Sequence, residues 1–227
     1  MTPAEWQILG VSFAIALRAV LWSLPFAIAL AYALSRRGFP GKSLLDAAVH
    51  LPLVLPPVLI GFFLLLAFGR RGPIGHWLEQ NFGVHLAFTA EGAALATAVM
   101  IFPLMVRAIR VAMEATDPGL IAAAALLRAS PLDRFFTVAL PLAAPGVLAG
   151  AATAFAAALG EFGAVITFAG NVPGETQTLP LAIYAALQAP DGEALALRLA
   201  AISFACAIAG LAGAEALQTW ARRRRDA

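Results

Sequence analysis

The sequence predicts an all-α membrane protein with about five transmembrane helices. Apolar residues make up 61% of the 227 positions, charged residues make up only 12%, and the mean hydropathy is +0.85. These values lie far outside the composition of soluble globular domains. The few charges also fall between long apolar runs instead of along one face of periodic helices, which is typical of bilayer spans. The composition therefore strongly disfavours a soluble fold.

Five segments reach the length of about 20 mostly apolar residues that a membrane-spanning helix needs. Two of them, Ala47 to Gly69 and Phe135 to Gly160, contain no Lys, Arg, Asp or Glu. The other three carry charges close to their ends, where long side chains can reach the membrane interface. These three are roughly Val11 to Leu34, Gly92 to Met113 and Leu195 to Leu217. An odd number of spans places the two termini on opposite sides of the membrane.

The distribution of Lys and Arg predicts which side is cytoplasmic. With an external amino terminus, only Arg70, Arg71 and Arg198 fall outside, and Arg18 lies within a span. This bias follows the positive-inside rule and places the carboxyl terminus in the cytoplasm, where the arginine-rich tail would anchor the chain beside membrane lipid. The cytoplasmic set comprises Arg36, Arg37, Lys42, Arg107, Arg110, Arg128, Arg134 and Arg222 to Arg225.

Two apolar segments, Phe162 to Gly174 and Thr176 to Leu187, are too short to span and are interrupted by turn-forming residues. We expect them to form an external loop or a re-entrant element. Because no repeat, linker or extramembrane domain is visible, residues 1–227 are expected to form a single transmembrane domain.

The cytoplasmic connection, about 114–134, contains the start signals of two helices. Asp117 precedes a proline and can cap a first helix. Ser130 also precedes a proline, and Asp133 follows three residues later, as in a capping box with Asp in place of Glu or Gln. A short helix must therefore end near Arg128. Its alanine-rich face suits the close approach of another protein, and the alternative is an amphipathic helix at the lipid interface.

The stretch from Ala122 to Pro145 contains a recognisable pattern, made of Ala123-Ala124, Leu127, Ala129-Ser130-Pro131, Phe135, Val138, Leu140-Pro141-Leu142 and Pro145-Gly146. This pattern resembles the EAA loop of binding-protein-dependent ABC permeases. In that family the loop forms a coupling helix that inserts into a cleft of the nucleotide-binding subunit. The resemblance implies that an ATPase contacts Ala123, Ala124, Leu127, Arg128, Ala129 and Ser130.

The sequence departs from the family pattern at two positions of this loop. Ala122 stands where the family usually has Glu, and Arg128 stands where it usually has Gly. If the turn requires a positive φ at residue 128, an Arg there costs on the order of 1 kcal/mol. The turn would then be adjusted, or the ATPase partner specialised.

Two further blocks narrow the resemblance to molybdate permeases, with tungstate and sulfate permeases as close relatives. The first block comprises residues 51–58 and 68–75, and the second comprises residues 160–164, 168–174 and 176–181. The resemblance implies a type I ABC importer permease fold in the bacterial cytoplasmic (inner) membrane. It also implies three partners: a second copy of the chain, a dimer of ATPase subunits, and a periplasmic or extracellular molybdate-binding protein.

Candidate residues for the translocation pathway or gate lie in the second span and after the fourth. Prolines in the second span free backbone groups at membrane depth, which is tolerated beside a cavity, although a simple packing kink explains them equally well. Gly160 and Gly163 flank Glu161 and fit a bend. The resemblance places this segment at the external gate, where Glu161 is expected to order the loop. The candidates are Pro52, Pro56, Pro57, Gly61, Glu161 and Gly163.

The remaining charges and motifs limit the chemistry. The external arginines either attract a dianion or pair with external carboxylates. The arginines are Arg18, Arg70, Arg71 and Arg198, and the carboxylates are Glu161, Glu175, Asp191 and Glu193.

The sequence contains no P-loop, nucleophile elbow or metal-ligand spacing. We therefore expect no catalytic residues, metal, cofactor or nucleic-acid partner, and the energy must come from another chain. An intramembrane enzyme is disfavoured because the spans contain few polar residues. A non-transporting membrane assembly protein remains the alternative, and copurification with an ATPase would separate it from a permease.

Overall fold

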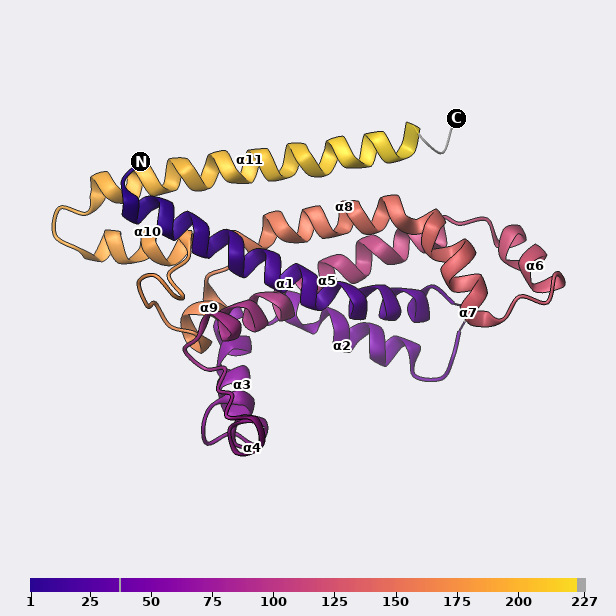
Figure 1. Ribbon diagram of the computed structural model, residues 1–227, viewed down its shortest axis with the longest axis horizontal. Helices are drawn as coiled ribbons and strands as arrows, with labels where there is room; N and C mark the ends of the chain where they lie inside the picture. The colour runs from indigo at the N-terminus through magenta and orange to yellow at the C-terminus, as the bar shows by residue number, and fades with distance from the viewer. Residues whose placement is uncertain (37, 224–227) are drawn as a thin grey trace.

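The computed structural model describes residues 1–36 and 38–223, and the described chain is helical with no β-strand (Figure 1). The elements are α1 (Pro3–Ser35), α2 (Lys42–Val54), α3 (Pro57–Phe68), α4 (Pro73–Phe82), α5 (Ala90–Glu114), α6 (Pro118–Leu126), α7 (Pro131–Arg134), the π-helical turn η1 (Phe135–Ala139), α8 (Leu140–Ala158), α9 (Gly163–Phe168), α10 (Leu179–Gln188) and α11 (Glu193–Arg223).

Four helical segments are individually long and apolar enough to cross a membrane. They are α1, α5, the continuous helix formed by α7, η1 and α8, and α11 up to Ala216. Helices α2 and α3 pass the same test only as a pair, and together they would make a fifth span. In Figure 1 the long helices lie roughly along one axis, α3 and α4 project to the side, and α6 lies at one end.

The segment predicted as one span, Ala47 to Gly69, is divided in the structure into α2 and α3. The two helices are bent by 112° at the break. Leu55 is extended there, with φ −77° and ψ 146°, because a residue that precedes a proline disfavours the helical region. Pro56 and Pro57 follow, and neither has an N–H to continue the helix. Pro52 is different, because α2 accommodates it without a break.

Small residues allow close packing between the long helices. Helix α5 packs against both α1 and α8, and α8 packs against α11. A Cβ added to Gly146 of α8 would lie 2.1 Å from the Ala112 Cβ of α5, and one added to Gly150 would lie 3.0 Å from the Ala108 Cβ. Such backbone proximity is the usual basis of helix association in membranes, where no hydrophobic effect drives the helices together.

The two termini of the described chain lie towards opposite ends of the helical bundle (Figure 1). Helix α1 begins at the end opposite α6, and α11 runs back towards the end where α6 lies (Figure 1). This arrangement agrees with an odd number of membrane crossings. Of the arginines used to predict the orientation, Arg37, Arg224 and Arg225 lie outside the described residues, and no side-chain placement is described for Arg222 and Arg223.

Candidate functional site

The coupling segment, defined here as residues 117–134, carries both predicted helix caps. The Asp117 carboxylate accepts a hydrogen bond from Gly119 N at 2.8 Å at the start of α6. At the start of α7, Ser130 Oγ accepts from Asp133 N at 3.1 Å, and Asp133 Oδ2 accepts from Ser130 N at 3.1 Å. The predicted capping box is therefore confirmed, with Asp in the acidic position.

Arg128 adopts the left-handed conformation, with φ +61°. Arg128 N donates to Ala125 O at 3.0 Å and Ala129 N donates to Ala124 O at 3.1 Å, which is the bonding pattern of a Schellman motif after the helix cap at Leu127. Glycine is the usual residue at this position because an L side chain is strained at positive φ. The turn therefore keeps the geometry that requires glycine, and Arg128 bears a cost on the order of 1 kcal/mol.

The coupling segment exposes large apolar side chains. Leu126 is 85% exposed, Leu127 is 84% exposed, and Leu132 is 70% exposed. Within the described structure, α6 buries none of its side chains; Ala123 is exposed and Ala124 is half-buried. Exposed apolar groups gathered this way mark an interaction surface. Sequence reasoning missed Leu126 and Leu132, although an apolar pair at the end of a short helix is a usable signal.

The gate region, defined here as α3 together with residues 160–178, is held by close backbone packing. A Cβ added to Gly163 of α9 would lie 2.7 Å from the Pro57 Cβ and 3.2 Å from Val58 N, both in α3. A Cβ added to Gly61 of α3 would lie 2.6 Å from Ala164 O and 2.7 Å from the Thr167 Cβ, both in α9. Gly163 was expected to permit a bend, but the structure requires it chiefly because two helices approach closely.

Glu161 orders the start of α9. Its Oε1 accepts a hydrogen bond from Ala164 N at 3.0 Å, so the carboxylate satisfies a free N–H of the first helical turn. This contact agrees with the expectation that Glu161 orders the loop. Any role of Glu161 in transport stays a prediction.

The loop that follows α9 is fixed by a buried threonine and by α1. Thr176 is fully buried, and its Oγ1 accepts from Val172 N at 2.8 Å and donates to Gly170 O at 3.2 Å. Leu179 N, at the start of α10, donates to Ser12 Oγ of α1 at 2.8 Å. Sequence reasoning missed Ser12 and Thr176. The partner of Ser12 lies 167 positions away in the sequence, whereas the partners of Thr176 lie only four and six positions away, in an irregular loop.

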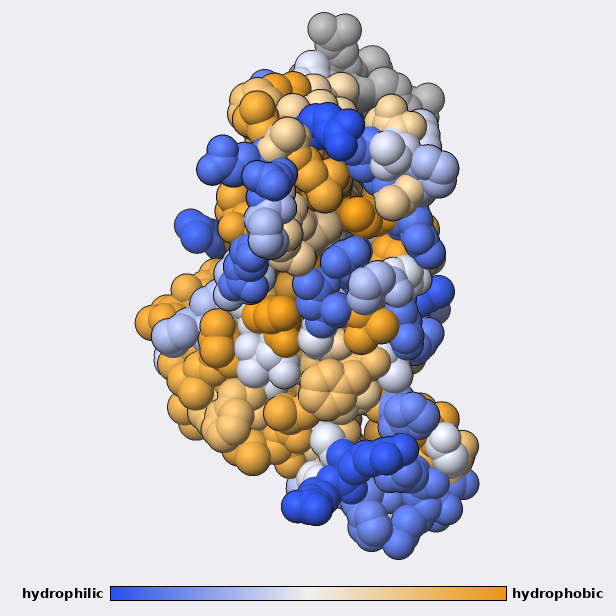
Figure 2. Space-filling model, turned by 90° about the vertical axis from the view of Figure 1, so that its left-hand side faces the viewer, coloured by the Kyte–Doolittle hydropathy of each residue, from blue (hydrophilic) through white to orange (hydrophobic). Residues whose placement is uncertain are grey.

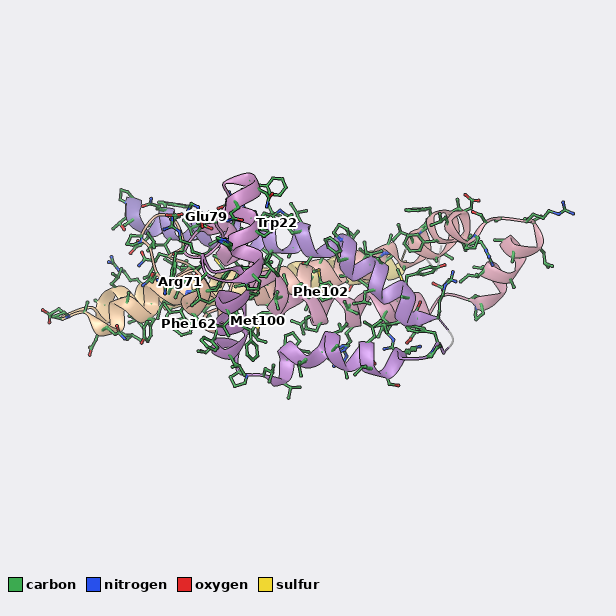
Figure 3. All side chains as sticks on the ribbon, turned by 90° about the horizontal axis from the view of Figure 1, so that it is seen from below. Trp22, Arg71, Glu79, Met100, Phe102 and Phe162 are labelled. Atoms are coloured by element: carbon green, nitrogen blue, oxygen red, sulfur yellow. The ribbon has the colours of Figure 1, made fainter. Side chains whose placement is uncertain are left out.

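The predicted pathway prolines do not meet in one site. Pro57 belongs to the α3–α9 contact, whereas Pro52 lines an apolar groove of about 520 Å³ between α1, α2 and α5. Trp22 and Phe102 also line this groove and come from α1 and α5 (Figure 3). Ser23 is its one hydroxyl-bearing residue, and that hydroxyl donates to Ala19 O at 2.6 Å. The groove therefore offers no suitable surroundings for a dianion within a single chain.

A second hollow, of about 540 Å³, lies between the α3–α4 turn, residues 85–89 and the gate region. Arg70, His85 and Glu175 are its ionisable lining residues. Hydrophilic residues also gather over the projecting part of the molecule that contains α4, at the bottom of Figure 2. This projecting part of the molecule is therefore polar enough to meet a water-soluble partner.

The predicted ion-pair partners of the external arginines are wrong within the described residues. Arg18 pairs with Glu91 at 3.5 Å, Arg70 with Glu79 at 3.6 Å, and Arg198 with the buried Glu5 at 3.4 Å. Figure 3 places Arg71 and Glu79 on the α3–α4 projection. The observed partners lie on α5, α4 and α1. Which of these helices would lie beside each arginine could not be predicted from the positions of the charges in the sequence.

An ionic cluster around Arg110 joins α2 to α5 near the carboxyl end of α5. Arg110 Nη1 lies 3.2 Å from both carboxylate oxygens of Asp46, and Arg110 Nε lies 2.8 Å from Glu114 Oε1. His50 Nδ1 lies 3.3 Å from Asp46 Oδ1. Arg107 lines the same hollow of about 340 Å³. The pairing of Asp46 with Arg110 was not predicted.

A family model described as the binding-protein-dependent transport system inner membrane component matches residues 23–224. The chain belongs to this family. It is 52% identical over 224 residues to the molybdenum transport system permease protein ModB of Escherichia coli (strain K12). The aligned region covers 99% of the chain and 98% of the relative. It is 48% identical over 195 residues to the molybdenum transport system permease protein ModB of Haemophilus influenzae, and that aligned region covers 86% of the chain and 85% of the relative.

A solved amino acid ABC transporter chain has the same overall fold. It superposes with a TM-score of 0.63 over 98% of this chain and 94% of that chain, at 19% identity. The ABC importer permease fold is therefore confirmed. As a member of an inner membrane family, the chain is a permease, and both the coupling segment and the gate region lie within the matched residues.

Proposed function

We propose that this permease is the membrane-spanning subunit of an ATP-driven importer that moves molybdate across the cytoplasmic membrane. The observation that carries the proposal is the 52% identity, over almost the whole length of both chains, to a relative named for molybdenum transport. Tungstate and sulfate are the alternative substrates. They share the tetrahedral dianion chemistry, so only a direct comparison of uptake separates them.

The ATPase is proposed to dock on the coupling segment. The two caps fix the starts of α6 and α7, and Leu126, Leu127 and Leu132 offer exposed apolar contact area on the coupling segment. The alternative is an interfacial helix, which requires its apolar residues on one stripe. Leu126 and Leu127 are consecutive and both highly exposed, and this favours a protein partner.

A second copy of the chain is proposed to complete the pathway. One chain provides only an apolar groove beside Pro52, and α3 projects from the bundle with exposed Val58, Phe62, Phe63 and Leu66. Covering α3 with another copy would bury these side chains and enclose a path between the two subunits. The external molybdate-binding protein would approach the hollow lined by Arg70, His85 and Glu175.

In this proposal the amino terminus is external and the carboxyl terminus is cytoplasmic. The bias of Lys and Arg supports this orientation. The coupling segment then lies in the cytoplasm, where ATP is available, and the gate region lies on the external side.

Reconstitution tests the proposed function. The permease, its ATPase and the binding protein would be placed in proteoliposomes, and uptake of labelled molybdate would be measured with ATP and with a non-hydrolysable analogue. We expect ATP-dependent uptake that tungstate inhibits more than sulfate. Uptake of sulfate in preference to molybdate would contradict the substrate, and failure to copurify with an ATPase would favour the non-transporting assembly protein.

A further inference from the structure

The helix that leads from the coupling segment into the membrane contains a π-helical turn. Residues Pro131–Ala158 form one continuous helix, within which η1 spans Phe135–Ala139. Leu140 N donates to Phe135 O, five residues earlier, which is the π-helical bond. Such turns are rare and frequently lie at functional sites. Pro141 gives a local cause, because it lacks an N–H and its ring opposes the carbonyl of residue 137.

The first residue of this turn contacts the end of α1. The Phe135 ring lies 4.5 Å from the Tyr32 ring between centroids, at an interplanar angle of 53°. The Phe136 ring lies 4.8 Å from the Phe135 ring, at an interplanar angle of 73°. Phe135 and Tyr32 are both partly buried against the core that joins α1, α5 and α8. One aromatic contact therefore links two spans at the point where the chain enters the bundle.

Tyr32 is itself held in place from its own helix. The Arg36 guanidinium carbon lies 4.5 Å from the centre of the Tyr32 ring, and Arg36 also donates a hydrogen bond to the Tyr32 hydroxyl. The cation–π contact and the hydrogen bond restrict the ring. Phe135 therefore meets a ring on α1 whose orientation is restrained by Arg36.

We infer that Tyr32 and Phe135, at the π-helical turn, form a joint that positions the coupling segment against α1. Helix α6 packs against α7 and η1, so a displacement of α6 reaches η1 first. The π-helical turn is the place where the helix can change its hydrogen bonding, and the Tyr32–Phe135 contact passes the movement to α1 as well as to α8. Both are positioning residues for coupling ATP hydrolysis to transport, and this inference rests on the proposed docking of an ATPase on the coupling segment.

The test uses the complete reconstituted complex and measures molybdate transported per ATP hydrolysed. Phe135→Leu and Tyr32→Leu remove one ring each, and we expect each to copurify with the ATPase and to hydrolyse ATP, while transport per ATP falls about 2- to 10-fold, the factor that one aromatic pair represents. Tyr32→Phe keeps the ring and should retain coupling. Phe204→Leu is the matched control, because Phe204 is 69% exposed on α11 and has no ring partner among the described residues.

A double variant separates a shared contact from two independent defects. If the two rings act through one contact, Phe135→Leu combined with Tyr32→Leu should reduce coupling no further than either change alone. Multiplied losses, or an unchanged ratio in both single variants, would overturn the joint. The expected result also excludes a purely structural role of the two rings. Loss of a purely structural contact would lower the thermal midpoint and the yield of the complex without changing the molybdate transported per ATP.

The outcomes also distinguish failure of the joint from failure of the proposed function. If the unaltered chain fails to bind an ATPase, the proposed function fails together with the joint. If the variants bind the ATPase normally and transport per ATP is unchanged, the joint alone is overturned.

Discussion

The coupling segment and the gate region are stabilised in opposite ways. In the coupling segment, caps come from residues two or three positions away, as at Asp117 and Ser130, and large apolar side chains stay exposed. In the gate region, Gly61 and Gly163 lie where a side chain would collide with another helix. Directly after this region, Leu179 N donates to Ser12 Oγ, 167 positions away in the sequence. The difference predicts two kinds of effect. A larger side chain in the coupling segment should block the ATPase, whereas a larger side chain in the gate region should disturb the packing of the permease itself.

The largest effect is expected in the gate region, for Gly163→Val. The added side chain collides with Pro57 and Val58 across the α3–α9 contact, and overpacking of this kind costs about 1–3 kcal/mol. Uptake should be nearly abolished while the ATPase still copurifies, because the coupling segment is distant in the fold. Gly160→Ala is the matched control, since a Cβ there approaches only Ala157 O, at 3.6 Å. Normal uptake by Gly163→Val would show that the α3–α9 contact does not control passage.

The next effect is expected in the coupling segment, for Ala124→Glu. A charged side chain on α6 should prevent close approach of the ATPase while the permease remains folded, because the described part of α6 contributes nothing to the buried core. Copurification and ATP-driven uptake should both fail, and the amount of membrane-inserted permease should not change. Leu127→Asp should act in the same direction because it places a charge in the exposed apolar surface.

A second Glu on the same helix, Ala122→Glu, is the control for the Ala124→Glu prediction. Ala122→Glu adds the residue that the family usually carries at this position, on an exposed part of the same helix. It should therefore preserve docking. Equal loss of copurification from Ala122→Glu and Ala124→Glu would indicate a general charge effect, and normal copurification with Ala124→Glu would show that the docking surface is assigned wrongly.

A smaller effect is expected at the external arginines. Arg70 is exposed and lies 3.6 Å from Glu79, so its charge is partly neutralised and accessible to salt. Replacing Arg70 and Arg71 together with Gln should reduce uptake modestly, and more at low salt, because screening at 0.1 M acts over about 10 Å. Complete loss of uptake at every salt concentration would instead point to a fixed anion site.

The smallest effect is expected at Arg128. Arg128→Gly relieves the strain of φ +61° and should stabilise the turn by about 1 kcal/mol, raising the thermal midpoint of the isolated permease slightly. Arg128→Ala should give no such gain, since alanine is strained at the same φ. Equal midpoints for the Gly and Ala variants would show that the strain is relieved elsewhere.

The same contrast explains what the sequence could predict. The caps at Asp117 and Ser130 depend on neighbours within a few residues, so local patterns were sufficient. The strained position at residue 128 was indicated by the resemblance to the family, which usually has Gly there. The prolines of the second span were expected to interrupt its helix, but a 112° bend was not predicted, because a long uncharged run satisfies the composition of a single span even when two adjacent prolines divide it. The ion-pair partners of Arg18 and Arg198, and the bond of Ser12 to Leu179, depend on which helices become neighbours.

The central claim is that the coupling segment and the gate region face opposite sides of the membrane, and single-cysteine labelling tests it most directly. Cys206 is the one cysteine of the sequence, so Cys206→Ser provides a background without cysteine for Leu127→Cys and Glu175→Cys, both at exposed positions. A membrane-impermeant maleimide should label Glu175→Cys in intact cells and Leu127→Cys only after the membrane is opened. Labelling of Leu127→Cys in intact cells, with Glu175→Cys protected until the membrane is opened, would contradict the orientation and with it the proposed coupling to a cytoplasmic ATPase.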